Sequence, residues 1–413
     1  MVKASALQQA FVSCSELLQN YRDYWQLVPF SCQQLPWQNP ALQQKLLSLP
    51  EQDLTAIDQS PVLQNQHFGD FFAGLFALNA YLKAASDEAS AAKLSPSQDA
   101  SSQLKPIPFW LANGIGGRKL AQIDAFAATL PPSQLPMLEW CAGKGHLGRL
   151  LAWQFERPVT SIEWQQQLCA DGSALATQFN IPQRFVHADV LTAEGSAVLA
   201  KQQQVLALHA CGQLHISLLQ QAVATGCQQL HIVPCCYHLI PDKQYQPLSA
   251  AGQQHDLSLS QHDLKLAVQG QVTAGARIEK LRHTEVQWRL AYQALRAELT
   301  NDSNYQPLSS VAKHWFSGDF ADFGRWAVDQ HQLSLPATID WQHYLQQGAK
   351  HAALVRRIEL VRHLFRRPLE LWLVLDRALY LEQQGYQVKL RAFCDYQVTP
   401  RNLLLQAERK LVG

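Results

Sequence analysis

The chain has 413 residues, a formal net charge of +1 and 47% hydrophobic residues. The near-neutral charge gives no bulk reason to expect a nucleic-acid partner, and no apolar run reaches the roughly 18 residues of a membrane span, so no membrane partner is expected. The first residues lack the apolar core of a secretory signal, and the nine cysteines are too unevenly spaced for a disulfide framework. We therefore expect a cytoplasmic protein with reduced thiols, and the sequence leaves its oligomeric state open.

Residues 1–105 are expected to form an N-terminal helical domain and a linker. The segment 71–82 is apolar almost all round, which is typical of a buried helix. Residues 85–105 are small and polar and indicate the linker.

Residues 106–240 predict a ligand-binding core of parallel βαβ units. A helix over 118–130 leads into strands whose spacing leaves room for a helix between neighbours. We expect these strands at 136–140, 159–163, 184–188, 204–209 and 229–233.

Residues 241–384 are expected to form a mixed, largely helical insertion. We expect a strand at 264–269 and helices at 277–299, 349–366 and 368–384. Residues 385–413 hold two β-rich segments, 386–393 and 402–408, which predict an antiparallel pair. The fold class is therefore α/β, a mostly parallel sheet completed by an antiparallel C-terminal strand pair.

A small-residue loop follows the first predicted strand. Glu139 and Trp140 end that strand, and Cys141-Ala142-Gly143-Lys144-Gly145 leads into an apolar-periodic helix. Such a loop lets a ligand lie against bare backbone, with the amides of the helix N-terminus facing it. A dinucleotide fold or an ordinary tight turn would use a similar loop.

Acids end the next two strands as well. Glu163 ends the second strand, and Asp189 follows the third. Because ligands of open α/β sheets bind outside the carboxyl ends of the strands, Glu163 is placed to accept hydrogen bonds from ribose hydroxyls. Asp189 could accept one from the exocyclic amine of an adenine. The acids predict a nucleoside pocket, and the alternative is three unrelated surface acids.

The loop and the acids resemble the motifs of class I S-adenosylmethionine-dependent methyltransferases, over residues 110–240 and the final strand pair. The resemblance implies a Rossmann-like sheet, S-adenosyl-L-methionine as cofactor and direct in-line methyl transfer. It implies that Glu139, Gly143 and Gly145 border the methionine part, that Glu163 binds the ribose and that Asp189 binds the adenine. The family has glycine where this chain has Cys141, so we expect the first turn of the loop to differ.

Four further strings resemble a narrower group of methyltransferase-like proteins. The group includes the methyltransferase domain of glutathione S-transferase C-terminal domain-containing protein and, more distantly, a tRNA 2′-O-methyltransferase. The strings are Gly117-Arg118-Lys119, Leu208-His209-Ala210-Cys211-Gly212, Pro234-Cys235-Cys236-Tyr237-His238 and Thr399-Pro400-Arg401-Asn402-Leu403. The distant likeness implies an RNA acceptor. The alternatives are a methyltransferase for a protein or small molecule, and a non-catalytic S-adenosylmethionine-binding module.

The ends of the fourth and fifth strands supply the candidate catalytic residues His209, Cys211, Tyr237 and His238. In one interpretation a histidine orients or deprotonates the acceptor. In a second, His209 and the cysteines bind a metal, but adjacent cysteines fit the usual ligand spacing poorly, so no metal is expected. In a third, the cysteines pack the pocket floor and Tyr237 stacks on the ligand.

A basic stretch follows in the C-terminal part. Residues 350–413 hold 12 Lys or Arg and six Asp or Glu. On a helix, the basic side chains would share a face that forms either a track for an RNA phosphate backbone or an ordinary solvated surface. They are Arg356, Arg357, Arg362, His363, Arg366 and Arg367.

Overall fold

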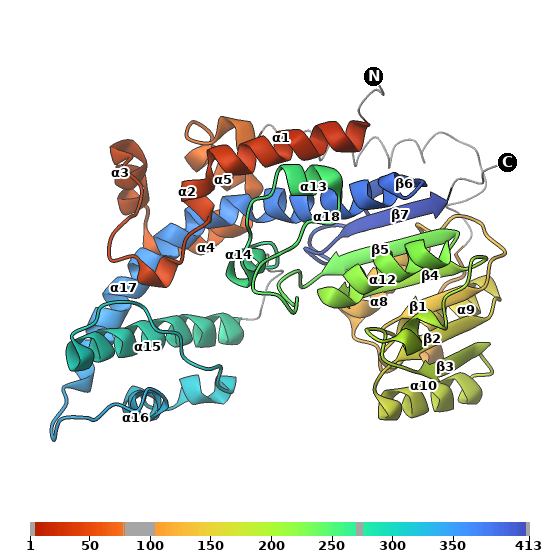
Figure 1. Cartoon of the computed structure of the whole chain (residues 1–413). Coiled ribbons are helices and arrows are strands. Elements are labelled where there is room, and N and C mark those ends of the chain that lie inside the picture. Colours follow the sequence, from red (N-terminus) through yellow and green to blue (C-terminus); the bar gives the residue numbers. More distant parts are fainter. Residues whose placement is uncertain (1–4, 77, 79–103, 270–275, 410–413) are drawn as a thin grey trace. The chain divides into compact units, whose positions relative to one another are not determined.

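The computed structural model describes residues 5–76, 78, 104–269 and 276–409. Seven strands within these ranges form one sheet in the order β3-β2-β1-β4-β5-β7-β6 (Figure 1). The first five strands in this order run parallel, and β7 is antiparallel to both β5 and β6. The strands are β1 Met137–Trp140, β2 Val159–Glu163, β3 Gln183–His187, β4 Gln204–Cys211, β5 Gln229–Cys235, β6 Tyr386–Ala392 and β7 Leu403–Arg409.

The predicted α/β fold class is confirmed, and so is the antiparallel C-terminal strand pair. Each predicted strand of this sheet begins and ends within two residues of the observed one. The short apolar runs were sufficient because buried parallel strands are apolar on both faces.

Connection handedness places helices on both faces of the sheet. From β1 the chain steps outward through β2 to β3, whereas β4 to β5 steps the other way. Because such connections are right-handed, α9 and α10 cover one face and α12 covers the other. The order reverses between β1 and β4, and the carboxyl ends at such a reversal are where ligands of open α/β sheets usually bind. The helices in this part of the chain are α8 Gly117–Ala127, α9 His146–Phe155, α10 Gln166–Gln178, α11 Ala193–Ser196 and α12 Gln213–Thr225.

The N-terminal helix α1, Ala6–Asn20, packs along the late helix α18, Arg366–Gln383. The Trp372 indole N–H donates to Ser15 Oγ at 2.9 Å, and the rings of Trp372 and Phe11 lie 5.3 Å apart. Helix α18 in turn packs against β6 and β7. The first helix therefore belongs with the sheet.

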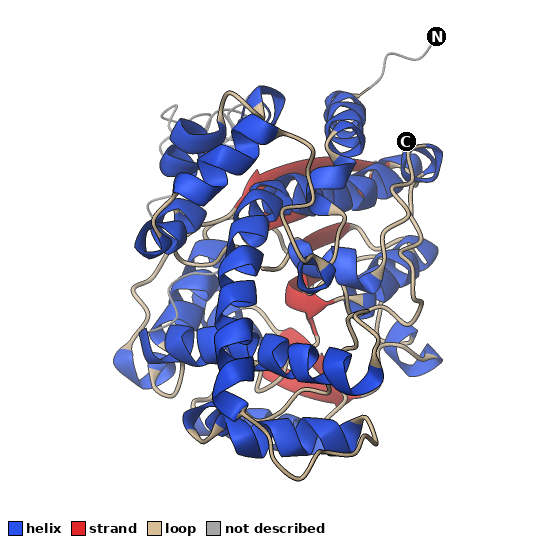
Figure 2. Cartoon of the chain, turned by 90° about the vertical axis from the view of Figure 1, so that its left-hand side faces the viewer, coloured by secondary structure: helices blue, strands red, loops and turns tan. Residues whose placement is uncertain are grey.

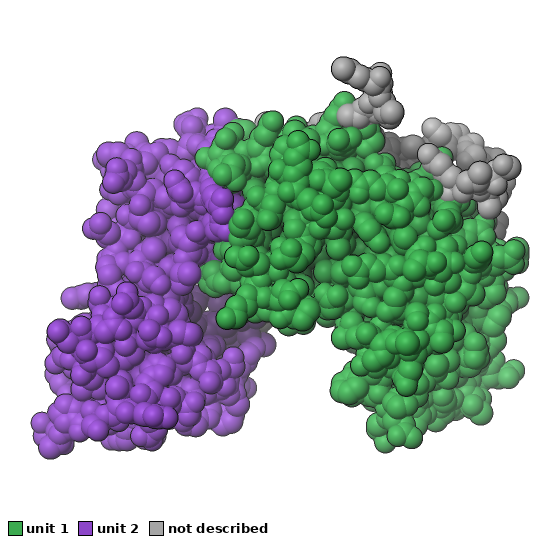
Figure 3. Space-filling model, viewed as in Figure 1, with its two compact units in different colours: residues 1–20, 74–272, 366–413 green, residues 21–73, 273–365 purple. Residues whose placement is uncertain are grey.

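The chain divides into two compact units (Figure 3). Unit 1 comprises residues 1–20, 74–272 and 366–413, and unit 2 comprises residues 21–73 and 273–365. These units cut across the predicted segments 1–105 and 241–384, because packing joins α1 to α18 rather than to the helices that follow it. Unit 1 also holds α7 Phe109–Ala112, α13 Ala250–Gln254 and α14 Gln261–Leu266.

Unit 2 is helical in its described residues, and Figure 2 shows helices and loops as the main elements outside the sheet. Its core gathers the rings of Trp288, Phe316, Phe320 and Phe323. Its elements are α2 Arg22–Trp25, η1 Pro29–Ser31, α3 Pro40–Ser48, α4 Glu51–Gln59, α5 Pro61–Phe68, α15 Ala276–Thr300, η2 Lys313–Ser317, α16 Phe320–Gln330, α17 Trp341–Arg362 and η3 His363–Phe365.

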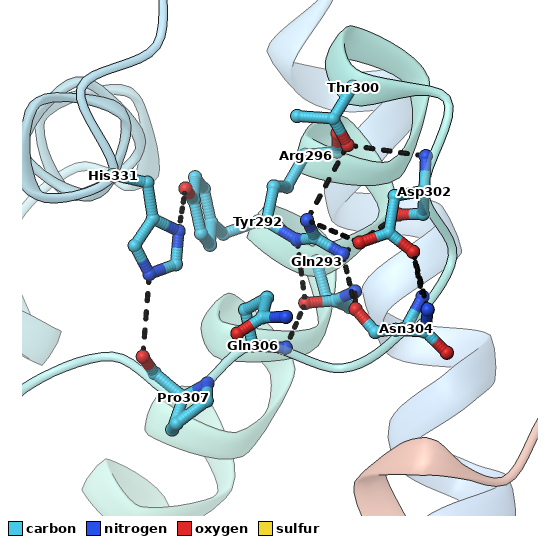
Figure 4. A network of polar contacts seen from close by, with 9 residues as sticks. All are labelled: Tyr292, Gln293, Arg296, Thr300, Asp302, Asn304, Gln306, Pro307 and His331. Atoms are coloured by element: carbon cyan, nitrogen blue, oxygen red, sulfur yellow. Dashed lines mark hydrogen bonds and ion pairs between the residues drawn. The ribbon is translucent and has the colours of Figure 1, made fainter.

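A polar network closes the C-terminal end of α15 in unit 2 (Figure 4). The buried Arg296 guanidinium donates to the main-chain oxygens of Asp302, at 2.8 Å, and Asn304. The Tyr292 hydroxyl donates to His331 Nδ1 at 2.6 Å, and His331 Nε2 faces the Pro307 carbonyl oxygen at 3.4 Å. The loop after α15 is thus held to its own helix.

One predicted element is wrong. The strand expected at 264–269 is instead the end of helix α14, which a capping box begins. The Ser260 side chain accepts from the Asp263 N–H, and the Asp263 side chain accepts from the Ser260 N–H. This Ser-x-x-Asp spacing was a readable helix-start signal, and it outweighs the alternation of the residues that follow.

The helix predicted at 71–82 lies partly outside the described residues, and residues 73–76 of it are helical. The linker predicted at 85–105 lies outside the described residues except for its last two positions. Among the described helices, none combines the length and the apolar character needed to cross a bilayer.

Candidate functional site

The loop between β1 and α9 has three residues in the left-handed conformation. Their φ angles are 57° at Cys141, 59° at Gly143 and 64° at Gly145. Cys141 adopts the conformation that glycine would favour, at a cost of about 1–2 kcal/mol, and the difference of its turn from that of the family stays a prediction. A Cβ added at Gly143 would meet no atom within 4 Å, so the backbone there is open to a ligand.

Glu163 is fixed against this loop. Its side chain is buried, and its Oε2 accepts a hydrogen bond from the Gly143 N–H at 2.8 Å. Its Oε1 accepts from the Gln165 N–H at 3.0 Å. A carboxylate has about four acceptor sites, so Glu163 retains capacity for hydroxyl donors while its orientation is set.

Glu139 lies beneath the first turn of α9. It is 3% exposed, and its Oε2 accepts from the Ser161 hydroxyl at 2.6 Å. Burial raises the pKa of Glu139 to about 7, against hydrogen bonds from Ser161 and the Gly148 N–H that favour the ionised form. Glu139 therefore supports the loop from below, and its contact with a methionine group stays a prediction.

Asp189 and Trp164 present side chains to solvent at the same edge of the sheet. Asp189 is exposed, and its Oδ1 accepts from the Leu191 N–H at 2.9 Å. Trp164 is 66% exposed, whereas Trp140 is buried and donates its indole N–H to the Leu214 carbonyl oxygen. Trp164 is thus available to cover a planar ring, and Trp140 is part of the core.

The thiol of Cys141 shows that several strand ends converge. Burial, followed by the charges of Glu163, Cys211 and Asp189 as smaller causes, raises the pKa of this thiol to about 12. These groups come from the ends of β2 and β4 and from the residues after β3, so the sheet edge brings together most of the residues expected to bind a nucleoside.

His209 lies in a bulge of β4 and has a φ of 65°. Its Nε2 is 2.9 Å from Gln122 Oε1, and the Gln122 amide nitrogen donates to the Val398 carbonyl oxygen at 3.3 Å. Because that carbonyl can only accept, the Gln122 amide is oriented with its oxygen toward His209, and His209 Nε2 carries the proton. Burial, with Arg401 as the next contribution, lowers the pKa of His209 to about 4. The imidazole is therefore neutral, and its Nδ1 carries the free lone pair.

Three thiols gather beside His209. The sulfur atoms of Cys211, Cys235 and Cys236 all lie within 4.8 Å of one another, and those of Cys211 and Cys235 are 3.4 Å apart. Hydrogen bonds from Cys211 and Cys235 lower the pKa of Cys236, whereas the pKa of Cys235 is raised. Hydrogen bonds thus link the three thiol groups.

The structure separates Tyr237 from the other candidate catalytic residues. Tyr237 is fully buried, and the Arg377 guanidinium lies 5.1 Å from its ring centroid. It packs beneath the strand ends, so the expectation that it stacks on a ligand is not met. His238 is half-buried, and its Nδ1 is buried without a hydrogen-bond partner among the described residues.

Two cations near the site were not among the predicted site residues. Lys119 lies within electrostatic range of Glu139 and His209, and Arg401 lies within range of His209 and Cys236. Both occupy strings that the sequence analysis singled out, at the start of α8 and before β7. The sequence strings contain both cations, but only the fold shows that Lys119 and Arg401 lie near the same strand ends.

The predicted basic track is used largely for contacts inside the protein. Arg362 is 1% exposed and donates from Nε to the Trp25 carbonyl oxygen at 3.0 Å. Arg357 donates to the carbonyl oxygens of Leu46 and Leu49 at the end of α3, each at 3.1 Å. The prediction of an ordinary solvated face is therefore wrong for Arg362. Internal partners are also present for Arg356, His363 and Arg367.

Comparison with known proteins identifies the domain that carries this site. Residues 118–243 match a family model described as a methyltransferase domain. This region contains all ten predicted site residues. No curated protein matches the chain.

Solved structures show partial likeness. TrmN from Thermus thermophilus is 18% identical, with 33% of this chain and 46% of that chain covered and a TM-score of 0.25. Magnesium protoporphyrin IX methyltransferase (ChlM) from Synechocystis PCC 6803, solved with bound SAH, is 11% identical, with 71% and 84% covered and a TM-score of 0.30. The matched region spans less than half of the TrmN chain.

Proposed function

We propose that this protein is an S-adenosylmethionine-dependent methyltransferase that transfers a methyl group by direct in-line displacement. The observation that carries the proposal is the buried Glu163 carboxylate, held by the Gly143 N–H beside a backbone surface that no side chain covers. This arrangement supports a bound ribose next to the loop. In this proposal Gly143 and Gly145 border the methionine part, Asp189 accepts from the adenine amine and Trp164 covers its ring.

The donor, when bound, supplies an electrophilic methyl group on a sulfonium. The protein's contribution is positioning, because in-line displacement depends mainly on aligning the nucleophile with the methyl carbon and the leaving sulfur. His209 is held by Gln122 and presents a neutral Nδ1 that can accept a proton or hydrogen bond from a hydroxyl or amine. Lys119, close to Glu139, is placed to contact an anionic group such as the donor carboxylate.

The acceptor that we propose to test first is RNA, with a protein or a small molecule as the alternative. The support is the distant likeness of the motifs at the ends of β4 and β5 to a tRNA 2′-O-methyltransferase, and membership of the narrower methyltransferase-like group is part of the same proposal. Arg362 does not serve as a phosphate contact in this proposal, because it is buried. Exposed cations such as Arg118 and Lys350 are the better candidates.

Calorimetry of S-adenosylmethionine binding tests the donor site. We expect Glu163→Ala and Asp189→Ala each to weaken binding by about 10-fold or more, since each removes hydrogen bonds to a charged acceptor. Glu194→Ala is the matched control, because Glu194 is an exposed acid near Asp189 in sequence. Equal affinities in all four proteins would refute the placement, and absence of binding by the unmodified protein would refute the enzyme.

Transfer of labelled methyl groups identifies the acceptor. Extract of cells lacking the protein is incubated with purified protein and labelled donor, with and without ribonuclease. Label that disappears with ribonuclease supports RNA, and label that persists in protein or solute supports the alternative.

A further inference from the structure

The cysteines at the ends of β4 and β5 are brought together by the sheet register. Cys211 and Cys235 are paired positions on these neighbouring parallel strands, and their sulfur atoms are 3.4 Å apart. Paired positions carry their side chains on the same face of a sheet. Two thiols from segments 24 positions apart therefore face one another as a direct result of the strand pairing.

The third sulfur joins them because the backbone turns at Cys236. In a regular strand the side chains of Cys235 and Cys236 would point to opposite faces. Strand β5 ends at Cys235, and Cys236 takes a left-handed φ of 47°, which breaks the alternation. All three sulfur atoms consequently lie within 4.8 Å of one another. Adjacent cysteines can thus share one site, although their spacing in sequence argues against it.

The separation of the sulfurs fits three corners of a tetrahedron around zinc. A Zn–S distance of about 2.3 Å places the sulfurs of a tetrahedral site about 3.8 Å apart. The Cys211 and Cys235 sulfurs, 3.4 Å apart, are slightly closer than this value, and the other two separations are at most 4.8 Å. Cys211 and Cys236 are partly exposed, so an ion has a route to the cluster.

Among the described residues no fourth side chain is grouped with the three sulfurs as a metal ligand, so a fourth protein ligand has to turn toward an ion bound there. His238 is the candidate. His238 follows Cys236 by two residues, and its Nδ1 is buried with no hydrogen-bond partner in the described parts of the chain. A buried imidazole nitrogen without a partner is unfavourable unless an ion or water meets it. Three thiolates and one imidazole are one of the usual ligand sets of structural zinc.

We propose that Cys211, Cys235 and Cys236, with His238 as fourth ligand, bind a zinc ion at the ends of β4 and β5. Binding displaces the remaining thiol protons to solvent and involves no change in oxidation state. The ion holds the ends of two strands together next to His209, so it fixes the position of the proposed acceptor-orienting group. Cys211 and His238 then act as ligands, and His209 alone retains the role of orienting the acceptor.

Metal retention tests the site without any methyl donor, so its outcome is independent of the proposed function. The full-length protein is loaded with Zn²⁺ under reducing conditions, exchanged into buffer with a weak chelator and analysed for metal. We expect about one zinc per chain in the unmodified protein and in Cys32→Ser, which removes a thiol from unit 2. Cys236→Ser should weaken zinc affinity by roughly 100-fold or more, and His238→Ala by at least 10-fold.

Cobalt provides a measurement on the unmodified protein, which does not depend on the folding of a variant. Co²⁺ bound by three thiolates gives intense sulfur-to-metal charge-transfer absorption, which Zn²⁺ abolishes by displacement. Absence of that absorption, or equal zinc loss from Cys32→Ser and Cys236→Ser, would overturn the proposal. A disulfide between two of the three cysteines in the protein purified under reducing conditions, detected as a mass lower by two hydrogens, would also overturn it.

Discussion

At the scale of single residues, the position of the candidate donor loop depends on two glycines, Gly145 and Gly172, that pack against the Phe185 ring. A Cβ added at Gly145 would lie 2.3 Å from the Phe185 ring, and one added at Gly172 would lie 2.2 Å from the same ring. The ring cannot move away from one glycine without approaching the other. The absence of a side chain at these positions lets α9 and α10 approach β3, which sets the start of α9 against the sheet.

We predict that Gly145→Ala and Gly143→Ala differ strongly in stability. Both residues have positive φ, so each substitution costs about 1–2 kcal/mol of backbone strain. Gly145→Ala adds the overlap with Phe185, which costs roughly 1–3 kcal/mol more, whereas the space around Gly143 is open. Chemical denaturation measures both free energies of unfolding. Equal losses of unfolding free energy for the two variants would show that the Phe185 ring does not pack closely against Gly145.

At the scale of elements, buried charges on α18 join it to the segments around it. Asp376 is fully buried, and its carboxylate accepts from the Tyr245 hydroxyl and from the main-chain N–H groups of Leu248 and Ser249. Its neighbour Arg377 donates to His215 of α12 at 2.8 Å. These contacts position the chain after β5, and with it the strand end that carries the thiols.

We predict that Asp376→Asn lowers the free energy of unfolding by about 3–5 kcal/mol, because it removes the buried charged acceptor of the Tyr245 hydroxyl and of the Leu248 and Ser249 N–H groups. The control is Asp256→Asn. Asp256 is exposed and accepts from the Ser258 N–H in a loop, so its loss should change stability by less than about 1 kcal/mol. Denaturant unfolding of the two variants is the measurement. A loss at Asp376 no larger than that at Asp256 would show that α18 does not depend on this carboxylate.

At the scale of the whole molecule, the predicted site and the first part of the basic stretch belong to different units, because only Arg366 and Arg367 of that stretch lie in unit 1. The predicted site residues lie in unit 1, whereas Arg356, Arg357 and Arg362 lie in unit 2. There Arg362 closes the contact between α17 and the segment that ends at Trp25. Several basic side chains of residues 350–413 therefore form contacts inside the protein. The formal positive charge of this segment alone does not indicate an anionic partner.

We predict that Arg362→Met lowers the stability of unit 2 but leaves S-adenosylmethionine affinity within about twofold at temperatures where the protein is folded. Loss of hydrogen bonds from a buried guanidinium should cost roughly 2–3 kcal/mol. Lys350→Met is the control, because Lys350 is exposed on the same helix. Hydrogen exchange would locate the stability change, and calorimetry would give the affinity. A tenfold loss of donor affinity in the folded variant would show that unit 2 takes part in donor binding.

The local sequence pattern was sufficient to predict the strands of the sheet and most of the residues at their carboxyl ends. Strands β1 to β5, the glycine loop and Glu163 are readable because apolar runs, glycines and strand-end acids act over a few neighbouring residues. The capping box at Ser260 was also readable, and missing it produced the wrong strand at 264–269. These same short signals carried the family resemblance, and the resemblance implied the cofactor.

Long-range packing decided the remainder. The meeting of Cys211 with Cys235, the contact of Gln122 with His209, the burial of Tyr237 and Arg362, and the pairing of α1 with α18 join residues far apart in the chain. Composition and periodicity show which side chains prefer burial, but not which distant segment covers them. Only the folded chain sets those pairings, because they depend on how complete helices and strands fit against one another.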